Sequence, residues 1–161
     1  MKDAKIKKLV LSALMAAVVC VATAVISIPL PGNGFANLGD CFIIVCGGFL
    51  GPWWGFAAAA AGSALSDIIL GYVIYAPATF IIKGVMALSV YFIAAGHGKS
   101  SVLKTATAAV CAEIIMVLGY FLFELVLYGA GAAIPDAFGN AMQGIIGAIA
   151  GTVLLTVLIK K

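Results

Sequence analysis

The sequence contains no arginine, a single histidine, and charged side chains at only 9% of its positions. Soluble domains carry roughly 25% charged residues. Hydrophobic residues make up 65% of the chain, and its mean hydropathy is +1.23. There is no phosphate-binding or dinucleotide fingerprint, and too little polar sequence remains to form a nucleotide-binding or nucleic-acid-binding surface. These absences indicate an integral membrane protein, in which any work driven by ATP belongs to another chain.

Apolar runs divide the chain into six segments, each able to form a helix. Crossing about 30 Å of hydrocarbon takes roughly 20 residues at 1.5 Å per residue. The second run is shorter, so it either crosses at a tilt, thins the bilayer or is re-entrant. We therefore expect an all-α membrane protein, a six-transmembrane-helix bundle that uses residues 1–161 as a single domain. The expected spans are residues 7–28, 37–50, 52–71, 77–95, 102–128 and 137–159.

The basic residues predict the orientation of the bundle. One group precedes the first span, a second flanks the connection between the fourth and fifth spans, and a third follows the sixth. With six spans all three groups fall on one side, and the opposite connections contain no lysine. Cytoplasmic loops are enriched in lysine and arginine, so we expect both termini to be cytoplasmic. The groups are Lys2, Lys5, Lys7 and Lys8; His97, Lys99 and Lys104; and Lys160 and Lys161.

Polar side chains are concentrated near the outer ends of the spans. An ionisable side chain in a bilayer costs about 3 kcal/mol or more unless it is paired or faces water. Glu113 is expected near the midplane, and the inner half contains almost nothing ionisable. The pattern predicts a polar cup that opens outward rather than a path through the membrane. Six polar side chains from five spans fall in the outer half: Asp40, Asp67, Lys83, Glu124, Asn140 and Gln143.

Four polar residues of the fifth and sixth spans are the first candidates for binding a ligand. Acid, phenol and amide groups supply directed donors and acceptors in an otherwise apolar pocket. The four cysteines, by contrast, lie in apolar runs without metal-ligand or redox spacing. We therefore expect a binding site with no metal, no cofactor and no catalytic residue. The candidates are Glu124, Tyr120, Asn140 and Gln143, and the cysteines are Cys20, Cys41, Cys46 and Cys111.

Three further polar residues complete the predicted substrate-binding set: Asn37, Asp67 and Lys83. Asp67 and Lys83, on adjacent spans, either form a structural ion pair or contact the ligand. Asp40 follows Asn37 at a helix start, where capping or interaction with the helix dipole is favoured over ligand contact.

The stretch of residues 37–84 carries the most distinctive motifs. It includes Asn37-Leu38-Gly39-Asp40, the Gly51-Pro52 turn, a Gly/Ala-rich span that ends in Ser66-Asp67, and Ala76-Pro77-Ala78-Thr79-Phe80-Ile81-Ile82-Lys83-Gly84. With the Pro/Gly-rich outer loop before it, this stretch resembles the substrate-binding S component of an energy-coupling factor (ECF) vitamin transporter. The resemblance covers nearly the full length. It is closest to members assigned to pyridoxine or to hydroxymethylpyrimidine, the thiamine precursor.

The resemblance implies that the chain is a single transmembrane substrate-binding domain in a prokaryotic cell membrane, and not an enzyme. Such proteins bind a vitamin with high affinity in an outward pocket, here capped by residues 29–36. They dock on a transmembrane T component, which is coupled to two cytoplasmic ATPases. Ala13 and Ala17 match the small-residue motif of the first helix and allow close helix approach. Pantothenate, thiamine and riboflavin stay open as alternative vitamins.

Two functions of other classes compete with this interpretation. A small self-assembling channel or secondary carrier would use Asp67 and Lys83 to line an ion path, and the purified chain alone would then support uptake. An intramembrane enzyme would use Asp40 and Asp67 as an acid pair. No second element of a protease or lipid-transferase signature accompanies these aspartates.

Overall fold

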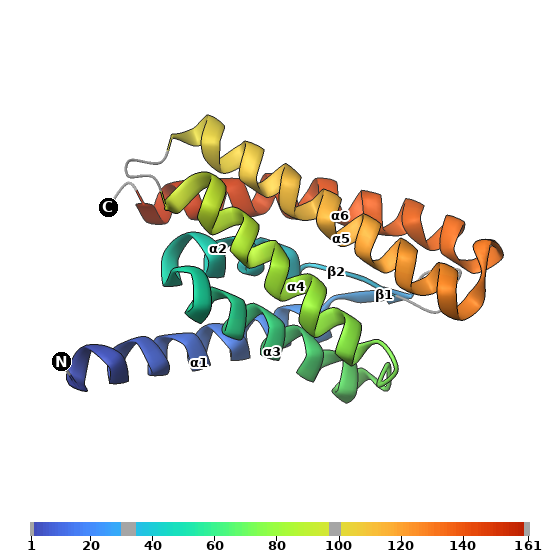
Figure 1. Ribbon diagram of the computed structural model, residues 1–161, viewed down its shortest axis with the longest axis horizontal. Helices are drawn as coiled ribbons and strands as arrows, with labels where there is room; N and C mark the ends of the chain where they lie inside the picture. The colour runs from blue at the N-terminus through green and yellow to red at the C-terminus, as the bar shows by residue number, and fades with distance from the viewer. Residues whose placement is uncertain (1, 30–34, 97–100, 160–161) are drawn as a thin grey trace.

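The computed structural model describes residues 2–29, 35–96 and 101–159. These residues form six α-helices, a two-stranded hairpin and a short π-helical segment, which agrees with the predicted all-α class (Figure 1). In chain order the elements are α1 (Lys2–Val25), β1 (Ser27–Pro29), β2 (Phe35–Asn37), α2 (Gly39–Leu50), α3 (Pro52–Leu70), α4 (Ala76–Val90), the π-helical segment η1 (Tyr91–Ala95), α5 (Val102–Tyr128) and α6 (Ala130–Ile159).

The short helix α2 lies inside the bundle. It packs against α1, α3, α4 and α6, and nine of its twelve residues are buried. Around it, α1, α3, α4, α5 and α6 follow one another, each packed against the next. Glycines allow the close approach of α2 to its neighbours, because Gly47 faces the backbone of Ala87 and Gly151 faces the side chain of Ile44.

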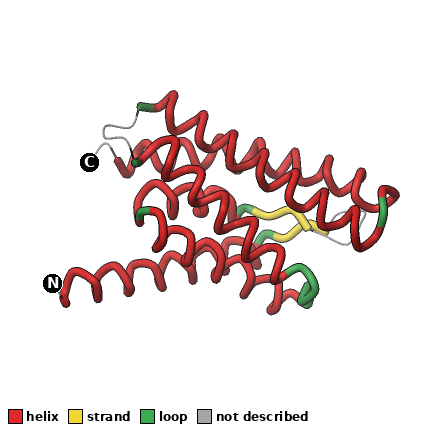
Figure 2. The backbone as a smooth tube through the Cα atoms, in the orientation of Figure 1, coloured by secondary structure: helices red, strands yellow, loops and turns green. Residues whose placement is uncertain are grey.

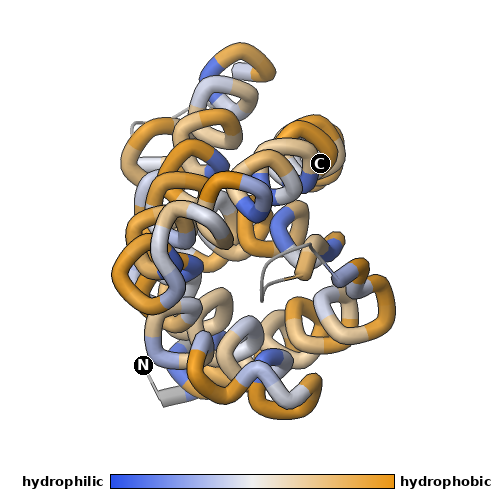
Figure 3. Tube along the Cα trace, turned by 90° about the vertical axis from the view of Figure 1, so that its right-hand side faces the viewer, coloured by the Kyte–Doolittle hydropathy of each residue, from blue (hydrophilic) through white to orange (hydrophobic). Residues whose placement is uncertain are grey.

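The surface of the bundle is apolar, as a lipid-facing surface requires. Val126 is 85% exposed, Trp53 74% and Phe138 73%, and apolar residues predominate in the end-on view of Figure 3. Five of the helices in the described parts of the chain are long and apolar enough to cross a membrane. The remaining helix, α2, has 12 residues and is about 18 Å long. Six complete spans therefore stay a prediction.

The two ends of the chain lie at the same end of the bundle, where η1 ends and α5 begins (Figure 1). Lys8 and Lys104 are exposed at this end. Two of the three basic groups therefore have described members at one end of the bundle, as the predicted orientation requires; the positions of His97, Lys99, Lys160 and Lys161 lie outside the described residues. Which compartment this side faces stays a prediction.

The first outer connection contains a β-hairpin where the sequence predicted only a loop. Strand β1 pairs antiparallel with β2, with Ile28 opposite Ala36. The first helix consequently ends at Val25 rather than at residue 28, because a residue that precedes a proline, as Ile28 precedes Pro29, favours extended backbone. Strand β2 contacts α1 and α6, so the hairpin lies between these helices (Figure 2).

Glycines at positive φ form the turns on both sides of α3. Gly51, at φ 87°, leads into Pro52 at the start of the helix, where the missing N–H of a proline costs no hydrogen bond. At the other end Gly71 adopts the left-handed conformation, with φ 88°, and its N–H donates to the carbonyl oxygen of Ile68 at 3.3 Å. Both turns are thus conformations that glycine favours.

The last helix starts earlier than the sequence predicted. We expected Pro135 and Asp136 in a loop before a span that begins at residue 137, whereas α6 begins at Ala130 and includes Pro135. A proline this close to a helix start removes only one intrahelical hydrogen bond. Asn140 and Gln143 consequently lie in the third and fourth turns of α6, deeper in the bundle than the first two turns we expected.

Candidate functional site

A narrow cavity lies in the half of the bundle that is opposite the chain ends. Its volume is about 390 Å³, including the part that is open to solvent. One strand and five helices, with the turn before α4, contribute its lining, and all seven predicted substrate-binding residues are among them. The lining residues are Thr23, Phe35, Asn37, Ser63, Asp67, Tyr75, Thr79, Lys83, Tyr120, Glu124, Asn140 and Gln143.

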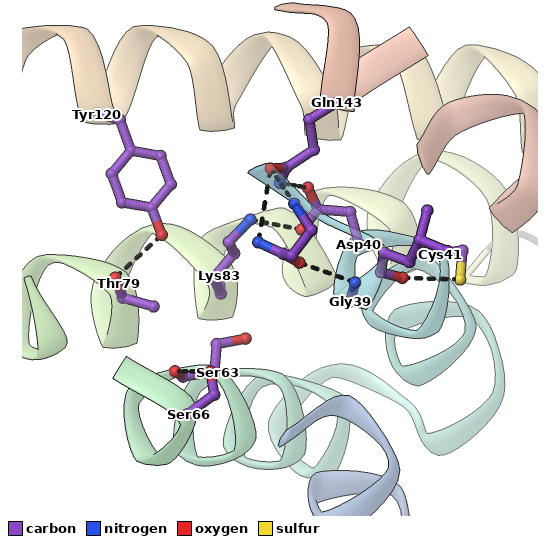
Figure 4. Close-up of polar contacts among 11 residues, drawn as sticks. Gly39, Asp40, Cys41, Ser63, Ser66, Thr79, Lys83, Tyr120 and Gln143 are labelled. Atoms are coloured by element: carbon purple, nitrogen blue, oxygen red, sulfur yellow. Dashed lines mark hydrogen bonds and ion pairs between the residues drawn. The ribbon is translucent and has the colours of Figure 1, made fainter. Parts of the chain in front are cut away.

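A continuous hydrogen-bonded network joins β2, α2, α4 and α6 beside the cavity (Figure 4). The backbone N–H of Asn37 donates to Oε1 of Gln143 at 2.8 Å. Nε2 of Gln143 donates to one carboxyl oxygen of Asp40, and Nζ of Lys83 donates to the other. Both Asp40 oxygens are therefore occupied, and the hairpin is connected through two side chains to the lysine of α4.

The ion pair in this network differs from the one the sequence favoured. Lys83 pairs with Asp40, and the two side chains are 3% and 0% exposed. We expected a helix-terminal role for Asp40 and a possible ion pair between Lys83 and Asp67. Asp40 does lie in the first turn of α2, and the N–H of Gly39 at the start of this helix donates to Oδ1 of Asn37 at 2.8 Å. The ion-pair partner expected for Lys83 was wrong, because position along a helix says nothing about which way the helix is rotated.

Aromatic rings form another wall of the cavity. The ring centroid of Tyr75 lies 6.4 Å from that of Tyr120 and 5.3 Å from that of Phe123. Nζ of Lys83 lies 5.4 Å from the centroid of Tyr120, within cation–π range. The hydroxyl of Tyr120 is hydrogen-bonded to that of Thr79 at 2.9 Å. This wall therefore consists of aromatic rings, and the hydroxyl group of Tyr120 is already held by a hydrogen bond.

Three buried oxygens that belong to cavity-lining residues have no hydrogen-bond partner: Oδ2 of Asp67, Oε2 of Glu124 and Oγ of Ser63. The other carboxyl oxygen of Glu124 accepts from the hydroxyl of Tyr75 at 3.4 Å. Most buried polar groups are hydrogen-bonded, and leaving one without a partner costs about 1–3 kcal/mol. The cavity is therefore built with acceptors that a bound molecule can use.

Five lining residues were not among the predicted set: Thr23, Phe35, Ser63, Tyr75 and Thr79. Two of them had a signal in the sequence. Ser63 is four residues before Asp67 and Thr79 is four residues before Lys83, so each pair shares a helix face. Thr23 stands alone among apolar residues of α1, and nothing in the sequence distinguishes it from a packing threonine.

The predicted docking residues Ala13 and Ala17 lie on α1, away from the cavity lining. Both are exposed, and they are one turn apart on the same face. Glu113 lies between the cavity network and α6, where its carboxyl group faces Gly147 and neither of its oxygens has a partner. A small-residue surface on α1 is thus free within the described chain, whereas Glu113 is enclosed.

The helical bundle with a polar cavity in one half has a counterpart among solved structures. The structure titled "Structure and mechanism of the S component of a bacterial ECF transporter" matches 96% of this chain and 96% of its own length, with a TM-score of 0.77 and 21% sequence identity. At that identity the match establishes a shared fold.

Sequence comparison identifies the family. The family model described as "ECF-type riboflavin transporter, S component" matches residues 3–160, and the chain belongs to this family of ECF S components. A protein of Pyrococcus woesei, described as "Uncharacterized protein in gap 3'region", is 35% identical over 144 residues, which cover 89% of this chain and 95% of that protein. The family predicted from the resemblance is confirmed, and with it a membrane transport subunit rather than an enzyme.

Proposed function

We propose that this chain is the high-affinity substrate-binding subunit of an ECF importer and that it takes a small heteroaromatic vitamin or precursor from outside the cell. Pyridoxine and hydroxymethylpyrimidine are our first candidates. The observation that carries the proposal is the cavity in the half of the bundle opposite the chain ends, where the partnerless oxygens of Asp67 and Glu124 lie among lining residues that include the ring of Tyr120. A ring system can stack on the tyrosine while its hydroxyl or amino groups donate to the carboxyl oxygens.

Riboflavin is the competing candidate, since the name of the family supplies it. Its fused rings and sugar-alcohol chain need more room than a single ring. We place riboflavin second because the lining of this narrow cavity would have to move further for it than for a single ring. Pantothenate and thiamine follow, because pantothenate lacks an aromatic ring and thiamine has a second ring that needs more room.

The interior beyond the cavity supports a binding subunit over a channel or carrier. Toward the chain ends, the described core around α2 is lined chiefly by apolar side chains, among them Ile44, Val90, Ala108, Ala109 and Leu155. An ion path should be polar along its length. A cavity closed on the inner side instead suits a subunit that holds its substrate until another component acts.

We propose that the other components are a transmembrane T component and two cytoplasmic ATPases, since the sequence contains no ATP-binding motif. The exposed face of α1 around Ala13 and Ala17 would contact the T component. Small residues there allow the backbones of two helices to approach closely. The vitamin would enter the cavity from the end of the bundle opposite the chain ends.

The test is the identity of the bound molecule. The full chain is purified from cells grown in rich medium, and the co-purified small molecule is identified by mass spectrometry. Titration calorimetry then compares pyridoxine, hydroxymethylpyrimidine, riboflavin, thiamine and pantothenate on ligand-free protein. Tight binding of pyridoxine or hydroxymethylpyrimidine supports the proposal. Tight binding of riboflavin would support the role as a substrate-binding subunit and make riboflavin its vitamin. Uptake by the chain alone, in vesicles without ATPases, would refute the role as a subunit.

A further inference from the structure

The cavity has acceptors available for a ligand, but its one cation is already engaged. Oδ2 of Asp67 and Oε2 of Glu124 have no partner, although the two side chains are only 3% and 1% exposed. They come from α3 and α5, so the two carboxyl groups belong to separate elements of the wall. Each can accept a hydrogen bond from a ligand, and Oγ of Ser63, also without a partner, adds a third polar atom.

Among the described residues, buried acidic side chains outnumber buried basic ones. Lys83 is the one buried cation among the side chains whose burial the structure describes, and both Asp40 and the ring of Tyr120 engage it. The loop sequence 30–34, Leu-Pro-Gly-Asn-Gly, contains no basic residue. The buried acids of the same described residues are Asp40, Asp67, Glu113, Glu124 and Asp136.

An anionic group on a ligand would therefore meet carboxyl groups without a free cation to balance it. Phosphate and carboxylate groups are recognised by arginine, lysine or several backbone N–H groups. The chain has no arginine. Moving Lys83 to the ligand would leave Asp40 buried with only Gln143 as its partner, and breaking one side of a buried ion pair is strongly unfavourable. Charges that repel at short range in a water-poor site discriminate strongly between ligands.

We propose that the cavity selects its vitamin by hydrogen-bond donors and against negative charge, with Asp67 and Glu124 as the residues that determine this specificity. This inference rests on the proposed function. The two carboxyl groups accept from hydroxyl, amino or ring N–H groups of the ligand. The bound form is the free vitamin, and the same vitamin carrying a phosphate ester is rejected. Any phosphate ester of the imported vitamin must then be formed inside the cell.

The first experiment compares each free vitamin with its own phosphate ester on the purified full chain. The pairs are pyridoxine, hydroxymethylpyrimidine and riboflavin with their monophosphates, titrated by calorimetry at neutral pH. For the vitamin that binds, we expect the ester to bind at least about 100-fold more weakly. An ester that binds within about tenfold of its parent overturns the proposed selection against negative charge and leaves the vitamin-binding function in place. If no free vitamin binds, both the proposed function and this inference are wrong.

The second experiment separates charge from size, because a phosphate could also be rejected for lack of room. Asp67→Asn and Glu124→Gln keep the side-chain volume and remove the charge. Each should weaken binding of the free vitamin, because one acceptor is exchanged for a group that also donates. Each should also lower the ratio of ester to parent dissociation constants by about tenfold, since one like-charge repulsion is lost.

A matched control is Asp3→Asn, which changes an exposed carboxyl group at the far end of α1 and should leave that ratio unchanged. Retention of the fold is checked for every variant by size-exclusion chromatography and thermal unfolding in detergent. If the ratio stays at the parental value in Asp67→Asn, in Glu124→Gln and in the double variant, rejection is steric and the proposal is wrong.

Discussion

Lys83 on α4 forms its ion pair with Asp40 on α2, across the interior of the bundle, and not with Asp67 on the preceding helix. The pair is enclosed on both sides, and Gln143 completes the hydrogen bonds of the Asp40 carboxyl group. Since α2 is the helix that the others surround, the pair holds the central element to the wall of the cavity. It therefore has a structural role whether or not a ligand contacts Lys83.

The first prediction is that each partner of this pair is required for stability. Lys83→Met leaves the Asp40 carboxyl group buried and unbalanced, and Asp40→Asn does the same to the ammonium group. Each should lower the free energy of unfolding by about 3–5 kcal/mol. The double variant Asp40→Asn/Lys83→Met should lose less than the sum, because no uncompensated charge remains.

The measurement is reversible unfolding in mixed micelles, followed by circular dichroism. Lys104→Met, at an exposed lysine, is the matched control and should change the stability by no more than about 0.5 kcal/mol. If the loss of stability in the double variant equalled the sum of the two single losses, the ion pair would not be the cause of those losses.

The second prediction concerns ligand contacts on α5 and α6. Glu124→Gln and Asn140→Ala should each remove one hydrogen bond to the ligand and leave its partner buried. The cost is about 1–3 kcal/mol, or about 5-fold to more than 100-fold in the dissociation constant measured by calorimetry. Phe138→Ala, at an exposed position of α6, should bind as the parent does.

The alternative outcome is equally specific. If Glu124→Gln and Asn140→Ala bind like the parent while Asp67→Asn abolishes binding, the ligand contacts α3 and α4 and the site assignment is wrong. Thermal unfolding of each variant shows whether loss of binding follows loss of the fold.

Counting residues along each span predicted seven of the twelve residues that line the cavity. Depth in the membrane follows from position in the helix, and five helices with polar groups at one depth can form one pocket. That is why Glu124, Asn140 and Lys83 were predicted and also line the cavity. Whether they bind substrate depends on a ligand and stays a prediction.

Depth could not predict the pairing inside the cavity. Asp40 and Asp67 have similar depths, and only the rotation and packing of α2 decide which one meets Lys83. The hairpin was also missed, since strands of three residues are too short to show an alternating pattern. Pro135 misled the prediction of α6, because a proline marks a helix boundary only when the chain after it also leaves the helix.

The third prediction is that the small-residue face of α1 binds another membrane helix. Ala13 and Ala17 are exposed one turn apart, so a bulky side chain at either position would keep a partner helix at a distance. Ala13→Trp and Ala17→Trp should strongly reduce co-purification of the T component and ATP-dependent uptake. Vitamin affinity of the isolated chain should not change.

A matched control for docking is Val126→Trp, at an exposed position of α5, which should assemble normally. Normal assembly of both alanine variants would mean that the T component binds elsewhere. Weaker vitamin binding in the isolated variants would instead indicate that the change disturbs the bundle.

The last prediction is the orientation in the membrane. Gly131 and Ser101 are both exposed, and they lie at opposite ends of α5 and α6. Because the exposed Lys8 and Lys104 lie at the end near Ser101, the positive-inside rule predicts that this end is cytoplasmic. In intact cells a membrane-impermeant thiol reagent should label Gly131→Cys and spare Ser101→Cys, and permeabilised cells should label both. The native cysteines are first replaced by alanine, since Cys111 is partly exposed. Labelling of Ser101→Cys in intact cells would mean that the bundle has the opposite orientation in the membrane. The cavity would then open to the cytoplasm and could not collect a vitamin from outside.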